Sequence, residues 1–61
     1  MSKMRVLVAF DFNEVAPGSP DDERAVQAMQ RIGDKLRRDG IVDNAHVWDV
    51  QFYNVETMTW D

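Results

Sequence analysis

Residues Ser19–Ile41 read SPDDERAVQAMQRIGDKLRRDGI and contain the strongest structural signal in this 61-residue chain. Ser19 is a favourable N-cap, and Pro20 suits the first position of a helix. Asp22 follows the cap by three residues, a spacing similar to that of a capping box. Acidic residues here also suit the positive end of the helix dipole. A helix is therefore predicted over residues 20–39.

The same residues predict how the helix ends and which side it covers. Lys35, Arg37 and Arg38 lie in the last turn, where the dipole favours bases. Gly40 suits a left-handed cap, and Ile41 is placed to fold back on the last turn. Apolar residues recur at helical spacing and form one stripe: Ala25, Val26, Met29, Ile32, Gly33 and Leu36. The glycine in this stripe predicts that the helix approaches the sheet closely there.

Apolar patterns predict strands on both sides of the helix. Residues 4–12 are apolar on both faces, which is typical of an interior strand. Residues 45–53 alternate, and residues 55–60 alternate again after a bend near Tyr53–Asn54, so a third strand is optional. The prediction is a single α+β domain over residues 1–61. It is a small β-α-β(-β) unit of two layers, with one helix packed on a sheet of two or three strands.

Size and composition limit how such a domain is stabilised. A chain of this length buries only about 60% of its unfolded surface and often needs a disulfide, a metal or a second subunit. There is no cysteine, and His46 is the only histidine, so no disulfide and no metal site are expected. Good packing or self-association, for instance as a homodimer, remains.

Charge and hydropathy bear on partners and compartment. Eleven acidic residues against seven basic ones give a formal net charge of −4, which argues mildly against nucleic acid and against anionic membranes as partners. No apolar run reaches transmembrane length, and no signal-peptide cleavage site follows the N-terminal apolar residues. We expect a cytoplasmic protein, of the producing or the host cell, without membrane association.

The segment VLVAFDFNEV, Val6–Val15, resembles the first motif of the haloacid-dehalogenase phosphatases, in which a buried strand leads into D-x-D-x-[TV]. This resemblance would make Asp11 a nucleophile. Asn13 stands in place of the second aspartate, and an amide cannot serve as the general acid. We interpret Asp11 as the end of a strand and predict no catalytic residue and no cofactor.

The length and the predicted element order are similar to those of the small tautomerases related to 4-oxalocrotonate tautomerase, which assemble into oligomers. Ser2 stands where those enzymes have their catalytic N-terminal proline. The resemblance therefore implies assembly with further copies and does not imply the activity.

Two surfaces are candidates for binding another protein. An acidic patch is predicted near the end of the first strand and the start of the helix: Asp11, Glu14, Asp21, Asp22 and Glu23. Carboxylates so placed can stand in for phosphates in a basic groove of a partner. The second surface is aromatic and suits partner binding or self-association, since Trp and Tyr are favoured anchors: Trp48, Tyr53 and Trp60.

The leading hypothesis is a small acidic, non-enzymatic protein-interaction module that inhibits or regulates a host protein by occlusion. In size and charge it resembles the stand-alone inhibitors made by phages and other mobile elements. One alternative is an oligomeric small-molecule enzyme with an inter-subunit site at Asp11 and Glu14. Another is a nucleic-acid binder that uses a basic stripe on the helix: Arg24, Arg31, Lys35 and Arg38. Surface ion pairs between Asp34 and Arg38 and between Lys35 and Asp39 argue against this last reading.

Overall fold

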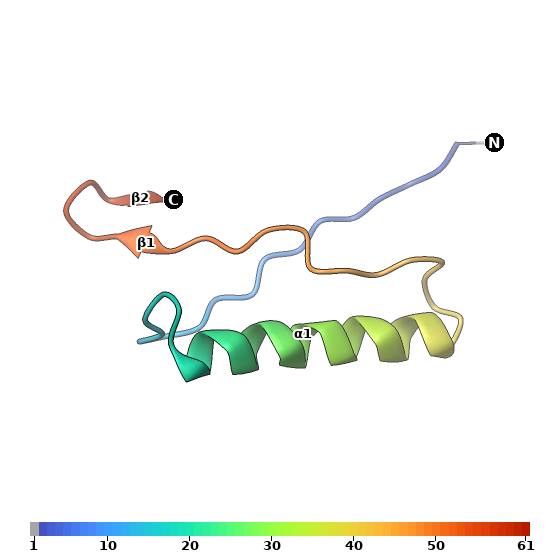
Figure 1. Cartoon of the computed structure of the whole chain (residues 1–61). Helices are drawn as coiled ribbons and strands as arrows, with labels where there is room; N and C mark the ends of the chain where they lie inside the picture. The colour runs from blue at the N-terminus through green and yellow to red at the C-terminus, as the bar shows by residue number, and fades with distance from the viewer. Residues whose placement is uncertain (1) are drawn as a thin grey trace.

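The computed structural model describes residues 2–61, which contain one helix and one two-stranded antiparallel sheet (Figure 1). Helix α1 spans Pro20–Arg38. Strand β1, Tyr53–Asn54, pairs with strand β2, Thr59–Trp60. The chain therefore has a small α+β fold in which α1 is the dominant element.

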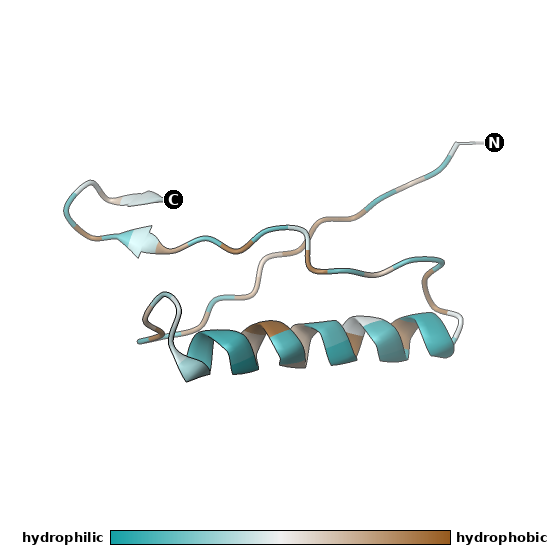
Figure 2. Cartoon of the chain, in the orientation of Figure 1, coloured by the Kyte–Doolittle hydropathy of each residue, from teal (hydrophilic) through white to brown (hydrophobic). Residues whose placement is uncertain are grey.

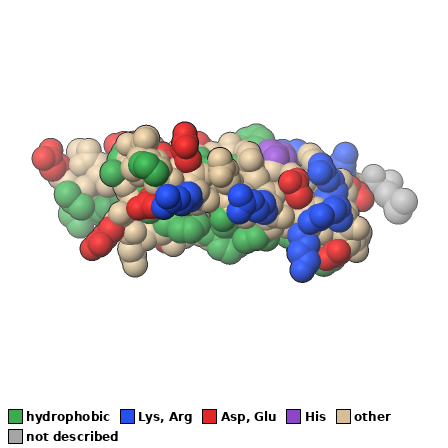
Figure 3. Space-filling view, turned by 60° about the horizontal axis from the view of Figure 1, so that its bottom comes forward, with side chains coloured by type: hydrophobic (Ala, Val, Ile, Leu, Met, Phe, Trp, Pro, Cys, Tyr) green, Lys and Arg blue, Asp and Glu red, His purple; other side chains and the backbone are tan. Residues whose placement is uncertain are grey.

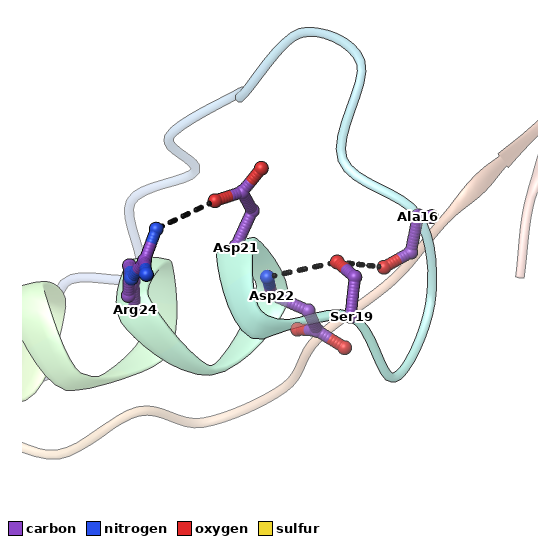
Figure 4. Close-up of polar contacts among 5 residues, drawn as sticks. All are labelled: Ala16, Ser19, Asp21, Asp22 and Arg24. Atoms are coloured by element: carbon purple, nitrogen blue, oxygen red, sulfur yellow. Dashed lines mark hydrogen bonds and ion pairs between the residues drawn. The ribbon is translucent and has the colours of Figure 1, made fainter.

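Helix α1 begins at the N-cap that the sequence predicts. The side-chain oxygen of Ser19 accepts a hydrogen bond from the Asp22 N–H at 3.2 Å and donates one to the Ala16 carbonyl at 2.6 Å (Figure 4). The Asp22 carboxylate reaches back one residue further than in a capping box, because it accepts from the Gly18 N–H at 2.9 Å. The Ser19 N–H donates instead to Ala16 at 3.2 Å. The preceding loop is thus tied to the first turn of the helix.

Helix α1 ends in a Schellman motif, as its sequence predicts. Gly40 follows the C-cap Asp39 and has a left-handed φ of 75°. The Gly40 N–H donates to the Arg37 carbonyl at 3.1 Å, and the Ile41 N–H donates to the Leu36 carbonyl at 3.0 Å. These bonds satisfy the last carbonyls of the helix and turn the chain back along it (Figure 1).

The N-cap gives a first testable prediction. We expect Ser19→Ala to destabilise the folded chain by about 1 kcal/mol, because the Asp22 N–H loses its acceptor. Thermal unfolding followed by far-ultraviolet circular dichroism measures the loss. Ser2→Ala removes the other serine at an exposed position and serves as the control. Equal losses in the two variants would contradict the capping role.

The strand predicted over residues 4–12 is not a paired strand in the structure. This segment runs past α1 as an open trace, and its residues make no backbone–backbone hydrogen bond within residues 2–61 (Figure 1). An apolar, β-branched segment has side chains that suit a pleated surface, whereas pairing also needs a second backbone within reach. The β-α-β arrangement is therefore not confirmed.

The two later predicted strands, 45–53 and 55–60, shrink to the hairpin of β1 and β2. Tyr53 lies opposite Trp60, and the pairing extends outward because Phe52 and Asp61 exchange two backbone hydrogen bonds, each of 2.9 Å. The rest of 45–53 has no strand partner within residues 2–61, for the same reason as residues 4–12.

The turn of this hairpin lies later than the sequence indicates. We expected a bend near Tyr53–Asn54, but the structure places the turn at residues 55–58. The Asn54 side-chain oxygen accepts from the Glu56 N–H at 2.9 Å, and Met58 has a left-handed φ of 57°. The turn is thus stabilised by an asparagine side chain and by a left-handed methionine, at a place where an Asn-Gly pair is the usual sequence signal for a hairpin.

The expected helix-on-sheet core is absent from residues 2–61, because none of their side chains is fully buried. The Cα radius of gyration is 14.1 Å, against about 10.5 Å for a compact domain of this length. The hydrophobic residues of α1 lie on the side of the helix along which the two extended segments, residues 2–17 and 41–52, run (Figure 2). No helix within the described residues combines the length and apolar character that crossing a membrane needs.

Candidate functional site

A wide apolar groove lies between α1 and the two extended segments. Its lining comes mainly from the stripe of α1, from residues 2–17 and from residues 41–53, with Asp22 of the first helical turn and Val55 and Trp60 of the hairpin at its ends. Met29 and Leu36 of the stripe are half-buried, whereas Ile32 is 51% exposed. The N-terminal wall is more open, since each residue from 2 to 14 is exposed. We call this surface the apolar groove.

Gly33 lets the second extended segment approach α1. A Cβ atom built on Gly33 would lie 3.1 Å from the Cβ of Ala45 and 3.7 Å from its carbonyl carbon. Side-chain carbons rarely come this close. The close approach at Gly33 is therefore present, but it is to the unpaired segment at Ala45 and not to the sheet that the sequence predicts.

Arg5 connects the two extended segments. Its guanidinium carbon lies 5.5 Å from the centroid of the Trp48 ring, a cation–π contact of about 0.5–1 kcal/mol at an exposed position. The His46 ring lies 6.0 Å from the same indole. Sequence reasoning missed Arg5, because a single base within an apolar run carries no signal until the facing aromatic residue is known.

The predicted aromatic surface divides into two parts. Tyr53 and Trp60 are opposite one another in the hairpin, and their rings meet edge to face with centroids 5.3 Å apart. The two side chains remain 45% and 53% exposed. Trp48 instead contacts Arg5 and His46. Trp60 therefore packs on its own hairpin and still offers an exposed edge.

The acidic patch is only partly free. Asp21 forms an ion pair with Arg24 at 3.2 Å (Figure 4). The Asp22 carboxylate accepts a hydrogen bond from the Gly18 N–H of the preceding loop. The side chains of the remaining members form no hydrogen bond or ion pair within residues 2–61 and are exposed: Asp11, Glu14 and Glu23. No group of three or more histidine or acidic side chains in that part of the chain is arranged to hold a metal ion.

The basic stripe lies on the side of α1 opposite the apolar stripe, where Figure 3 shows Lys and Arg side chains spaced along the helix. The two ion pairs that the sequence predicts, Asp34–Arg38 and Lys35–Asp39, do not form within residues 2–61. Asp34 pairs with Arg37 at 3.3 Å, because positions three apart on a helix are neighbours as much as positions four apart. Arg31, Lys35 and Arg38 form no ion pair within residues 2–61.

The described residues do not form an arranged binding or catalytic site for either alternative function. Asp11 and Glu14 face solvent and have no orienting partner within residues 2–61, so an inter-subunit enzyme site there stays a prediction. The basic stripe likewise stays a predicted nucleic-acid surface. Comparison with known proteins finds no match to this chain among family models, curated sequences or solved structures.

Proposed function

We propose that this chain is a small acidic, non-enzymatic protein-interaction module. It would act in the cytoplasm as an inhibitor or regulator of a host protein, like the small accessory proteins of phages and mobile elements. One observation carries the proposal: the chain leaves its own apolar groove uncovered. Within residues 2–61 no side chain is fully buried, and even Val8, Phe10 and Trp48 are more than 60% exposed. Contiguous apolar surface of this kind is typical of a protein interface.

The apolar groove and the acidic patch would divide the work of binding. Covering the groove removes apolar area from water and so stabilises the complex. Glu14 is exposed within the N-terminal wall of the groove, and Glu23 is exposed on α1 outside the groove's lining. Both carboxylates favour targets with a basic rim. Charges at the rim of an interface act mainly on association rate and salt dependence. A target that offers an apolar surface beside a basic one would be occluded.

Site-specific photo-crosslinking in cells that produce the chain tests this proposal. A photoreactive residue at Met29 lies in the apolar groove, whereas one at Gln27 lies on the exposed side of α1. We expect protein adducts from position 29 and few from position 27. Equal yields at both positions, or no protein adduct at position 29, would contradict the proposal.

The acidic patch has its own arm of the same experiment. When the crosslinking is repeated in a lysate of those cells, Glu14→Lys should lower the adduct yield from position 29 at low salt and change it little at high salt, since salt screens exposed charges. Glu14→Gln is the matched control for loss of charge without reversal. A loss that is independent of salt would remove the acidic patch from the mechanism.

A further inference from the structure

We infer that the first occupant of the apolar groove's N-terminal wall is a second copy of this chain. The two copies join by antiparallel pairing of residues 4–12 about a two-fold axis at Val8. The inference rests on the proposed function, because it names the polypeptide that covers the same apolar surface.

The N-terminal segment has free backbone and apolar side chains together. Residues 4–12 make no backbone–backbone hydrogen bond within residues 2–61 and contain neither proline nor glycine. The uncharged run Val6–Phe10 is exposed, with Val6, Leu7 and Val8 at 66–69%. Such an edge is a template for a strand from another chain. A second copy is the partner that always accompanies the first.

The accessible surface of the chain matches what a homodimer needs. A compact monomer of 7.1 kDa should expose about 4,100 Å², whereas this chain exposes 5931 Å². The excess is roughly 1,800 Å² per chain, or about 3,700 Å² for two copies, which falls within the range of obligate homodimers. The next requirement is a register in which the two edges fit each other.

The sequence of this segment is complementary to its own reverse. In an antiparallel pair, residues directly opposite one another point to the same face of the sheet. A two-fold axis must therefore lie between one residue and its own copy, so that this residue is opposite itself. With the axis at Val8, Val6 lies opposite Phe10 of the second copy, and Arg5 lies opposite Asp11 of the second copy. Opposite charges directly across a ladder stabilise the pair. Symmetry makes this pair twice.

Neighbouring registers fit less well. An axis at Leu7 places Arg5 opposite Ala9, and an axis at Ala9 places Asp11 opposite Leu7. The axis at Val8 keeps all of residues 4–12 paired. Arg5 can pair with Asp11 of the second copy while its guanidinium carbon lies over the Trp48 ring, because a guanidinium has five N–H donors.

Single cysteines in this cysteine-free chain locate the axis. Residues on the axis lie directly opposite their own copies, within disulfide reach, whereas residues one position away face a different residue. We expect Val8→Cys to form disulfide-linked dimers roughly tenfold faster than Leu7→Cys or Ala9→Cys. Faster crosslinking at position 7 or 9 would overturn the assigned register.

Charge exchange tests the same register without crosslinking. Arg5→Asp and Asp11→Arg each place like charges opposite one another, so each variant alone should dissociate at a roughly tenfold higher concentration. Mixing the two variants restores opposite charges, and native mass spectrometry should show mainly the mixed dimer. A statistical mixture of dimers would overturn the Arg5–Asp11 pairing. Lys3→Asp, mixed with Asp11→Arg, is the matched control and should show no such preference.

Light scattering with hydrogen exchange separates this inference from the proposed function. A monomer at every micromolar concentration overturns the inference. If the α1 amides of that monomer exchange freely, the chain still lacks its cover and the proposed function stands. If they are strongly protected, the chain needs no partner, and both conclusions fail.

Discussion

We expect Met29→Asp to lower the free energy of unfolding of the chain by about 3 kcal/mol, which is enough to abolish its cooperative unfolding transition. Met29 lies in the middle of the apolar stripe, is half-buried already and lines the apolar groove. When a polypeptide covers the groove, a carboxylate at this position loses water and gains no partner. Small domains are only marginally stable, so this loss is comparable with their whole stability.

Urea unfolding followed by far-ultraviolet circular dichroism, at a fixed protein concentration, measures this effect. Gln27→Asp is the matched control, because it adds the same charge to an exposed position of the same helix. It should change the unfolding free energy by about 0.5 kcal/mol or less. Equal losses in the two variants would mean that the groove is never covered and that the carboxylate remains in water.

The helix could be predicted because its signals are local. Ser19 and Gly40 mark its ends through hydrogen bonds to residues within five positions, and the structure contains those bonds. The details that failed were choices between near neighbours. Asp22 bonds to Gly18 rather than Ser19, and Asp34 pairs with Arg37 rather than Arg38. Several acceptors lie within reach of one side chain, and the sequence does not rank them.

The strands could not be predicted because pairing depends on distant backbone. Residues 4–12 have the composition of an interior strand, yet nothing within residues 2–61 pairs with them. The hairpin turn depends on Asn54 and on a left-handed Met58, and methionine is not a residue from which such a turn is inferred. The sequence thus indicates a sheet of two or three strands, whereas the structure of residues 2–61 pairs only β1 with β2.

The candidate surfaces were predicted by residue type and not by arrangement. The rings of Tyr53 and Trp60 are in contact, whereas the Trp48 ring contacts Arg5 instead. Two acids of the patch stabilise the helix start through local bonds, which leaves fewer for a partner. Competition from such local partners is invisible in a list of charged residues.

Gly33→Val displaces the second extended segment and destabilises the chain by about 2 kcal/mol. The glycine stands where even a single added carbon would lie 3.1 Å from the Cβ of Ala45, and valine adds two further methyl groups. Helix propensity opposes this effect only weakly, because valine is a better helix residue than glycine by a few tenths of a kcal/mol. The steric term therefore decides the sign.

A double-mutant cycle with Ala45→Gly isolates this contact. Ala45→Gly removes the Cβ atom that valine would meet, so the double variant should recover about 1 kcal/mol of the loss. Gln27→Val places the same side chain on the exposed side of α1 and should cost well under 1 kcal/mol. Both values come from urea unfolding. Additive effects of the Gly33 and Ala45 substitutions would show that the segment does not pack on α1 at this point, and the apolar groove would then lose its second wall.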